Sequence, residues 1–203
     1  MKRFLDVCLS VIGLIIFSPL MFVFALLIKI QDGGPITFSQ ERWGKVGKKF
    51  KVYKFRTMVP DADKKYGFSP ARENDIRITF LGKILRATAM DELPQLINIL
   101  KGDMSFVGPR ALAVAEISTT HPLFYERHKI RPGLTGPAQI GLARDVPFEV
   151  KLGHDLDYIQ KVSISGDIQY LLQSLWITLF AGWEKRSNKS HKQNEIGRTI
   201  VNK

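Results

Sequence analysis

Two adjacent carboxylates, Asp91 and Glu92, begin the most informative stretch of the chain, DELPQL at 91–96. The stretch GDMSFVGPR follows at 102–110, and basic residues stand on both sides of the acidic pair. Acidic groups between basic side chains suit phosphoryl transfer, because cations stabilise the charge on the transferring group. A carboxylate can also attack phosphorus and form an acyl phosphate, which divides one transfer into two steps.

The residues around Asp91 are typical of a helix start. We expect Asp91 to cap a helix that ends at Gly102, with Pro94 in the first turn, where its missing N–H loses no hydrogen bond. The free N–H groups of such a turn attract phosphate and stabilise an ionised carboxylate. The alternative is that Asp91 and Glu92 are only cap and first-turn residues.

Basic side chains that could converge on a diphosphate are Lys54, Arg56, Arg86 and Arg110. Such side chains bind phosphate oxygens through charge-assisted hydrogen bonds. Adjacent carboxylates also suit Mg²⁺, which prefers oxygen ligands, keeps waters and bridges to substrate phosphates. We therefore predict Mg²⁺ at Asp91 and Glu92, with a nucleotide-sugar diphosphate as the substrate.

The composition indicates one globular domain with an anchor. The 203 residues can bury one core, and thirty Lys and Arg against nineteen Asp and Glu give a net charge of +11. This charge suits nucleic acid, anionic lipid or phosphorylated small molecules, and alone it does not choose among them. The single cysteine, Cys8, excludes an internal disulfide and a multi-cysteine zinc site, which favours a cytosol-facing domain.

The chain begins with an apolar segment that includes 22 uncharged residues from Val7 to Ile28. At about 1.5 Å per residue, a helix of this length crosses a hydrocarbon core of roughly 30 Å. Near its middle, Pro19 deprives the carbonyl of Ile15 of its helical partner, and the hydroxyl of Ser18 can replace that partner. A kink is therefore expected at Ser18-Pro19.

Basic residues flank both ends of this segment, which conflicts with a single crossing under the positive-inside tendency. We therefore predict a re-entrant helix-break-helix over 1–31. One kinked spanning helix is the alternative. A cleaved signal peptide fits less well, because Asp6 interrupts the basic start and no small-residue cleavage site precedes Gln31.

Residues 32–183 have the pattern of a compact, mostly helical α+β domain with a small β-hairpin. We predict hairpin strands at 36–40 and 50–56, a helix at 78–86 and a helix over 111–128 that breaks near Pro122. Residues 131–137 are expected to form a constrained loop, because they contain two prolines and two glycines.

Apolar residues from Ile168 to Phe180 recur at helical spacing and predict an amphipathic helix. Such a stripe usually faces a core. Burial at a membrane surface is the alternative, favoured by Trp176, Phe180 and the basic stretch that follows. Residues 184–203 are basic and poor in apolar residues, which predicts a flexible tail.

Together these motifs resemble a known family, the monotopic polyprenol-phosphate phosphoglycosyl transferases, which are small bacterial sugar transferases. The resemblance runs from Ser18-Pro19 through FSQERWG (38–44), YKFRTM (53–58), DELPQL (91–96) and GDMSFVGPR (102–110) to RPGLTG (131–136), and it covers most residues to about 180. The chain departs from the family pattern at Ala111, where a second proline is usual, and at Ala89-Met90. Neither departure removes a reactive group.

The resemblance implies that Asp91 attacks a UDP-sugar, releases UMP and holds the phosphosugar until polyprenol phosphate accepts it. Glu92 would bind magnesium or handle the proton of the acceptor. Arg86 and Arg110 match basic positions near the phosphates, and Asp155 resembles a late acidic motif near the site. The family also implies the re-entrant helix and a place on the cytoplasmic face of the bacterial inner membrane.

Two other functions stay open at this point. A membrane-tethered binder of nucleic acid or anionic lipid would explain the charge of +11 but not the acidic pair. A catalytically silent scaffold with a transferase-like body is the other. We expect anionic lipid and no nucleic acid as a partner. The sequence leaves the sugar, the glycan pathway and the oligomeric state open, a homo-oligomer included.

Overall fold

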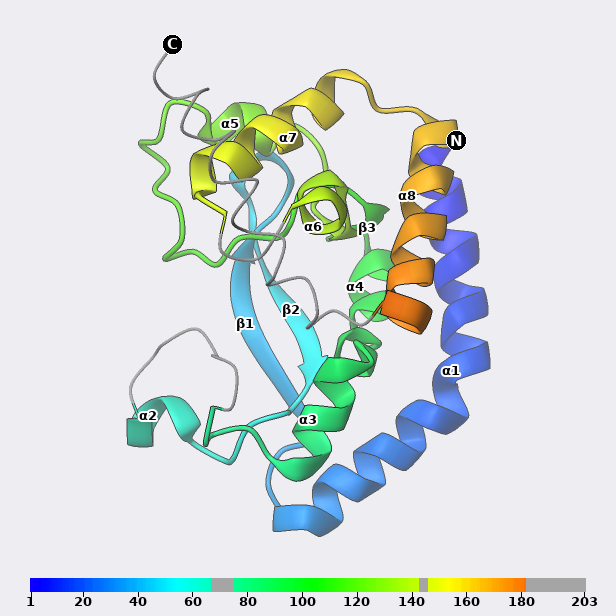
Figure 1. The fold of residues 1–203 in the computed structure, drawn as a ribbon, viewed down its shortest axis with the longest axis vertical. Helices are drawn as coiled ribbons and strands as arrows, with labels where there is room; N and C mark the ends of the chain where they lie inside the picture. The colour runs from blue at the N-terminus through cyan, green and yellow to red at the C-terminus, as the bar shows by residue number, and fades with distance from the viewer. Residues whose placement is uncertain (67–74, 143–145, 182–203) are drawn as a thin grey trace.

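The computed structural model describes residues 1–66, 75–142 and 146–181 and shows a helix-rich α+β fold (Figure 1). Two small sheets lie among the helices. The α-helices are α1 (Lys2–Asp32), α2 (Ala62–Tyr66), α3 (Phe80–Ala87), α4 (Gln95–Lys101), α5 (Phe124–Arg127), α6 (Pro137–Gly141), α7 (Phe148–Gln160) and α8 (Ile164–Trp176). The strands are β1 (Thr37–Trp43), β2 (Lys49–Phe55), β3 (Ser105–Val107) and β4 (Gly133–Thr135). Short turns of 3₁₀-helix span Lys45–Gly47 and Met90–Glu92, and a π-helical turn spans Ile177–Ala181.

The predicted hairpin is confirmed. Strands β1 and β2 pair antiparallel from Thr37 opposite Phe55 to Trp43 opposite Lys49. Gly47 has a φ of 69°, a left-handed conformation that glycine adopts without steric cost, and it helps the chain to reverse. Strand β1 runs to Trp43, beyond the predicted end at 40, because the Trp43 ring packs edge-to-face on Phe124 in a buried cluster.

The second sheet corrects the prediction that residues 131–137 form a constrained loop without regular structure. Strand β4 pairs in parallel with β3. Glycines allow this pairing, because a Cβ at Gly133 would lie 2.1 Å from the Gly108 nitrogen and a Cβ at Gly136 would lie 2.0 Å from the Gly108 oxygen. The backbones of these glycines can therefore approach each other more closely than those of residues that carry a Cβ.

The predicted helix over 111–128 is also wrong, since within it only α5 is helical. The apolar residues of this stretch, Leu112, Ile117 and Phe124, all contact one core cluster with Trp43. In a single helix these side chains would point in directions fixed by the helical repeat of about 3.6 residues. Irregular turns instead allow each of them to contact Trp43.

Helix α1 is long and apolar enough to cross a membrane. It bends along its length in Figure 1, and Pro19 lies inside it. The Ser18 Oγ donates to the Ile15 carbonyl oxygen at 2.9 Å, which confirms the predicted replacement for the partner that Pro19 removes. The predicted kink is therefore a bend within one continuous helix.

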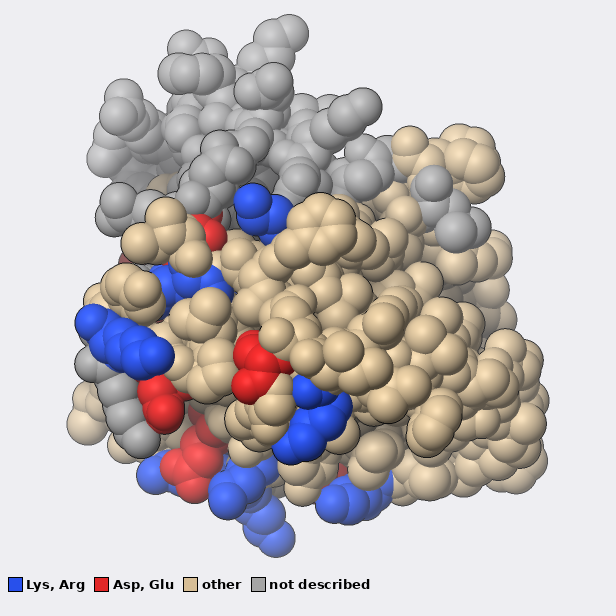
Figure 2. All heavy atoms as spheres, turned by 90° about the horizontal axis from the view of Figure 1, so that it is seen from below, with Lys and Arg blue, Asp and Glu red and all other residues tan. Residues whose placement is uncertain are grey.

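One face of α1 packs against the body along much of its length. Leu14 contacts the cluster of Val52, Leu96 and Ile99, while Ile28 belongs to the cluster of Phe55 and Leu85. Many other apolar side chains of α1 are exposed, among them Ile12, Ile15, Ile16, Phe22, Val23, Leu26 and Leu27. In Figure 2 the described charged side chains gather in the left and central parts of the face, and the described surface in the right part is uncharged.

Polar contacts attach both ends of α1 to the globular body. Near the N-terminus, Arg3 donates to the carbonyls of Ile99 and Leu100 at 2.5 and 2.8 Å. Asp6 is buried and accepts hydrogen bonds from the Ser105 hydroxyl and the Phe106 amide, both at 3.0 Å. Lys2 pairs with Asp167 at the start of α8. At the other end, Asp32 pairs with Arg56.

Helix α8 confirms the predicted amphipathic helix and contradicts the expectation that its apolar stripe faces a core. Ser163 caps the helix by accepting from the Gly166 amide at 3.2 Å. Leu172 and Trp176 remain 62% and 63% exposed. A stripe of this kind is typical of helices that rest on a membrane surface or a partner. The basic segment 184–203 lies outside the described residues.

Candidate active site

Asp91 and Glu92 lie in the 3₁₀ turn between α3 and α4. Ala89 precedes the turn with a φ of 57°, and the Glu92 amide donates to the Ala89 carbonyl at 3.2 Å. The prediction that Asp91 caps the helix is wrong, since Pro94 occupies the cap position of α4. Asp91 and Glu92 belong to the 3₁₀ turn, so α4 begins only after Pro94. The predicted end at Gly102 is confirmed by its left-handed φ of 94°.

The two neighbouring carboxylates have different electrostatic surroundings. Burial raises the pKa of Asp91, the charge of Glu92 raises it further, and Lys54 and Arg86 oppose the rise, which leaves the pKa at about 6. Burial also acts to raise the pKa of Glu92, but its ion pair and hydrogen bond with Lys54 outweigh this, so the pKa of Glu92 is lowered. Glu92 is therefore ionised at neutral pH, and Asp91 titrates just below it.

Arg86 reaches this turn from α3. Thr79 caps the start of this helix, since its hydroxyl accepts from the Gly82 amide at 3.0 Å. Gly82 allows α3 to pack on the end of β2, because a Cβ there would lie 2.0 Å from the Thr57 carbonyl oxygen. In this position the Arg86 Nε donates to the Thr57 hydroxyl at 2.8 Å. The charge of Arg86 also acts on Asp91 and lowers its pKa.

Arg56 lies elsewhere. Its guanidinium pairs with Asp32 and donates to the carbonyls of Pro35 and Met58 at 2.6 and 3.2 Å. The residue is buried, and all these contacts tie the end of β2 to the segment that follows α1. The structure thus gives Arg56 a role in attaching the end of α1 to the body and does not bring it to the pocket beside Glu92.

A small pocket of about 20 Å³ opens beside Glu92. This volume holds about one water-sized group, such as one oxygen of a phosphate. Its lining residues are Arg42, Val52, Lys54, Glu92, Gln95, Met104, Arg110, Ala111, Gly133, Leu134 and Gln139. Arg42 and Gln139 were not among the residues that the sequence predicted. Arg42 could have been found from its position in the hairpin, because it follows Gln40 by two residues and therefore lies on the same face of the strand.

Arg110 lines this pocket, and its backbone is held in place by contacts with β4, the strand that pairs with β3. The Gly133 amide donates to the Pro109 carbonyl at 2.9 Å, and Arg110 forms a β-bridge with Gly133. The side chain of Arg110 is exposed and makes no hydrogen bond or ion pair with any residue that the structure describes. It is therefore available to an anion.

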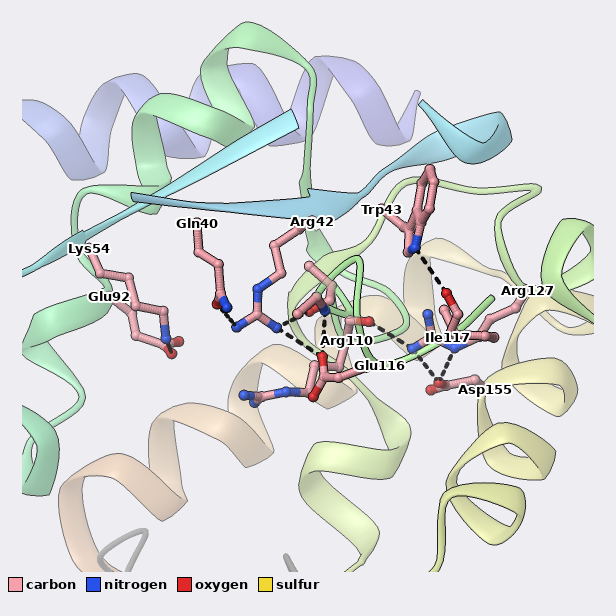
Figure 3. A network of polar contacts seen from close by, with 12 residues as sticks. Gln40, Arg42, Trp43, Lys54, Glu92, Arg110, Glu116, Ile117, Arg127 and Asp155 are labelled. Atoms are coloured by element: carbon pink, nitrogen blue, oxygen red, sulfur yellow. Dashed lines mark hydrogen bonds and ion pairs between the residues drawn. The ribbon is translucent and has the colours of Figure 1, made fainter. Parts of the chain in front are cut away.

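Asp155 is buried. It lies next to Arg127 (Figure 3). It pairs with the buried Arg127 at 2.8 Å, and the same Arg127 nitrogen donates to the Arg110 carbonyl at 2.7 Å. Burial raises the pKa of Asp155 against the opposing charge of Arg127. Asp155 thus reaches the site only through Arg127, as a positioning residue for the backbone of Arg110.

Asp155→Asn is expected to lower the free energy of unfolding by about 3–5 kcal/mol, because it leaves the buried charge of Arg127 without its partner. Thermal unfolding in detergent measures this. Asp157→Asn on the exposed face of α7 is the control and should leave stability unchanged. An Asp155→Asn protein with unchanged stability would contradict this account of the buried pair.

The acidic pair fits a magnesium ion in part. Among the described residues no group of three or more His, Cys, Asp or Glu could hold a metal, so a site built only from protein ligands is not present there. Mg²⁺ commonly uses one or two carboxylates and completes its six ligands with water and substrate phosphate. Asp91 and Glu92 match that arrangement, although Glu92 already pairs with Lys54.

Comparison of the sequence with known proteins places the chain in a family. The family model described as bacterial sugar transferase matches residues 1–181. The chain is 38% identical over 191 residues to a UDP-N-acetylgalactosamine-undecaprenyl-phosphate N-acetylgalactosaminephosphotransferase of Aeromonas hydrophila, a match that covers 91% of this chain and 45% of the relative.

Two further relatives show how much of each protein is shared. The exopolysaccharide production protein PSS of Rhizobium leguminosarum bv. phaseoli is 39% identical over 193 residues, covering 90% of this chain and 96% of the relative. A UDP-glucose:undecaprenyl-phosphate glucose-1-phosphate transferase of Escherichia coli (strain K12) is 39% identical over 196 residues, covering 92% and 41%. The chain thus spans less than half of two of these relatives and nearly all of the third. With the family match over residues 1–181 and the acidic turn in place, the chain belongs to the bacterial sugar transferase family.

Proposed function

We propose that the protein transfers a sugar 1-phosphate from a UDP-sugar to a membrane polyprenol phosphate, giving a polyprenyl diphosphate sugar and UMP. The observation that carries this is Asp91, a half-buried carboxylate with a pKa of about 6, beside Glu92 and two cations. Two of the relatives are named as undecaprenyl-phosphate transferases that use UDP-sugars, which supports the donor and acceptor classes.

In the proposed first step, an Asp91 carboxylate oxygen attacks the phosphorus that carries the sugar. The bond from that phosphorus to the bridging oxygen breaks, and UMP leaves with the bridging oxygen. In the second step, a phosphate oxygen of the polyprenol phosphate attacks the same phosphorus, and the bond to Asp91 breaks. A pKa of about 6 suits this role, because Asp91 is mostly ionised at neutral pH while burial keeps its carboxylate poorly solvated.

Glu92 and the basic residues supply the electrostatics of the proposed reaction. Since the pKa of Glu92 is lowered, this carboxylate stays charged and is better suited to hold a metal than to accept a proton. We propose that Asp91 and Glu92 bind Mg²⁺ together with donor phosphate oxygens. When bound, the ion would neutralise phosphate charge. Arg86 and Arg110 would bind the phosphates from opposite sides of the turn.

We further propose that α1 enters the cytoplasmic leaflet of the bacterial inner membrane and returns to the same side. Contacts of Arg3, Asp6 and Lys2 hold its N-terminal end on the body, and the Asp32–Arg56 pair holds its C-terminal end. A helix that crossed the bilayer would carry its N-terminal end away from the cytoplasmic body. The exposed apolar stripe of α8 is suited to rest on the same anionic membrane surface.

Labelling of the N-terminus tests this topology. A unique reporter placed before Phe4 should react in inside-out vesicles and stay protected in sealed right-side-out vesicles, like a reporter in the catalytic body. A reporter at the exposed Lys51 serves as the body control. A periplasmic N-terminus would exclude the re-entrant helix while leaving the chemistry intact.

The activity itself is tested by incubating the purified full chain with Mg²⁺, polyprenol phosphate and a panel of UDP-sugars. We expect UMP release with at least one donor and, without acceptor, a protein mass increased by one phosphosugar. Omission of polyprenol phosphate should limit UMP to about one equivalent per protein. No UMP with any donor, under conditions where a relative is active, would contradict the proposal.

A further inference from the structure

Arg42 is a basic residue of the pocket with no assigned role. It lies on β1, and in the antiparallel register Phe38 faces Lys54, Gln40 faces Val52 and Arg42 faces Phe50. Directly opposed residues share a face of the hairpin, so Gln40, Arg42 and Lys54 form one polar row. This row points to the pocket that Glu92 and Arg110 also line (Figure 3).

The contacts of Arg42 fix its guanidinium and leave part of it unused. One terminal nitrogen donates to the Ala111 carbonyl at 2.7 Å and lies 3.3 Å from Glu116, and the other donates to the Gln40 side-chain oxygen at 2.6 Å. The Nε is buried and donates to no group in the described part of the chain. Five N–H donors are available on an arginine, so the fork retains capacity for an anion.

Electrostatics also point to an anion between Arg42 and Arg110. Burial lowers the pKa of Arg42, the charge of Arg110 lowers it further, and Glu116 and Glu92 oppose the change. Two guanidinium groups that repel each other across a pocket are stabilised when a phosphate lies between them. The pocket of about 20 Å³ has room for one phosphate oxygen at that place.

We propose that Arg42 binds the diphosphate of the nucleotide-sugar donor, as the fixed guanidinium of a pair whose other member is Arg110. This inference rests on the proposed function and names the residue that takes the place predicted for Arg56. The hydrogen bonds to Gln40 and Ala111 hold Arg42 before the donor arrives, so little side-chain entropy is lost on binding. In this proposal Arg42 contacts only the donor. Its substitution should therefore leave the binding of polyprenol phosphate unchanged.

Binding of UDP to the Asp91→Asn protein tests the proposal without depending on turnover. Isothermal titration calorimetry in detergent with Mg²⁺ should show that a further Arg42→Gln change weakens UDP binding about 10–100-fold. Arg42→Lys, which keeps the charge but loses the fork, should fall between. Lys51→Gln, an exposed charge on the opposite face of the same hairpin, should bind like the parent.

A second readout separates donor binding from a structural role of Arg42. In the protein with Asp91 intact, Arg42→Lys should raise the KM for the UDP-sugar and leave the KM for polyprenol phosphate unchanged. Glu116→Gln removes the carboxylate beside Arg42 and should leave UDP binding unchanged or tighter, since a competing anion is gone.

Equal UDP affinity of the Arg42→Gln protein and its Asp91→Asn parent would overturn the inference. So would a Glu116→Gln protein that loses UDP affinity as strongly as Arg42→Gln, because that result assigns Arg42 to the support of the 110–116 loop. If UDP bound neither to this parent nor to the protein with Asp91 intact, that result would instead contradict the donor class, and thus the proposed function.

Discussion

Asp91→Asn is expected to lower sugar-phosphate transfer by at least about 10³-fold and to abolish the phosphosugar mass on the protein. The amide cannot attack phosphorus as a carboxylate does, although it preserves the size and shape of the side chain. UMP release from a UDP-sugar, with and without polyprenol phosphate, gives the rate, and intact-protein mass spectrometry gives the adduct. Asp103→Asn is a matched control in the neighbouring GDMSFVGPR stretch.

The same substitution should stabilise the protein at neutral pH. The folded-state pKa of Asp91 is about 6 against an ordinary value of 3.8, so the folded protein binds more protons between these values and loses stability as pH rises through them. Asp91→Asn removes that loss, by about 1–2 kcal/mol after allowance for solvent screening. The unfolding temperature should therefore rise by a few degrees at pH 7.5 and remain unchanged below about pH 4.

Two outcomes would contradict this account of Asp91. Full turnover by Asp91→Asn would exclude the covalent step and favour direct transfer between donor and acceptor. Loss of activity together with lower stability at pH 7.5 would show that the carboxylate supports the fold. Transfer by the unchanged protein that is lost in Asp91→Asn, while UDP still binds, would identify an enzyme. A membrane-tethered binder would keep its affinity after the same change, and it would show no transfer before it.

The parts of the site that local pattern determines could be predicted from the sequence. The hairpin follows from alternating β-formers around Gly44 and Gly47, and the helix end at Gly102 follows from a glycine in a left-handed conformation. The bend at Pro19 follows from its missing N–H. Each of these depends on contacts within a few residues, where residue type alone constrains the backbone.

The cations of the pocket could not be assigned in the same way. Alternation along a strand puts Lys54 and Arg56 on one face, but β2 ends at Phe55, and Arg56 turns toward Asp32. Arg42 joins the pocket only because β1 extends to Trp43, and that extension depends on packing against Phe124 more than eighty residues later. The exchange of Arg56 for Arg42 therefore required tertiary contacts that the sequence does not display.

The β3–β4 pair was hidden for a related reason. Strands of three residues carry almost no periodic signal, and their parallel pairing joins segments almost thirty residues apart. Pro132 and the glycines of RPGLTG favour a loop when considered locally. The glycines instead permit the close approach of two backbones, and this approach is what positions Arg110.

Gly133→Ala is expected to destabilise the protein by more than about 3 kcal/mol and to abolish donor binding. Its Cβ would lie 2.1 Å from the Gly108 nitrogen and 2.3 Å from the Thr135 oxygen, and both of these are backbone atoms that cannot rotate away. One strand would have to move, and Arg110, which bridges to Gly133, would move with it. Thermal unfolding in detergent, with and without UMP, measures the stability and the binding together.

Gly153→Ala is the matched control, because a Cβ at Gly153 would meet nothing within 4 Å and the residue lies inside α7. Alanine favours helix more than glycine, so this change should raise stability by about 0.4–1 kcal/mol and leave activity unaltered. If Gly133→Ala were as stable and as active as Gly153→Ala, β3 and β4 could not approach as closely as described. Arg110 would then owe its position to Arg127 and Asp155 rather than to the glycine crossing.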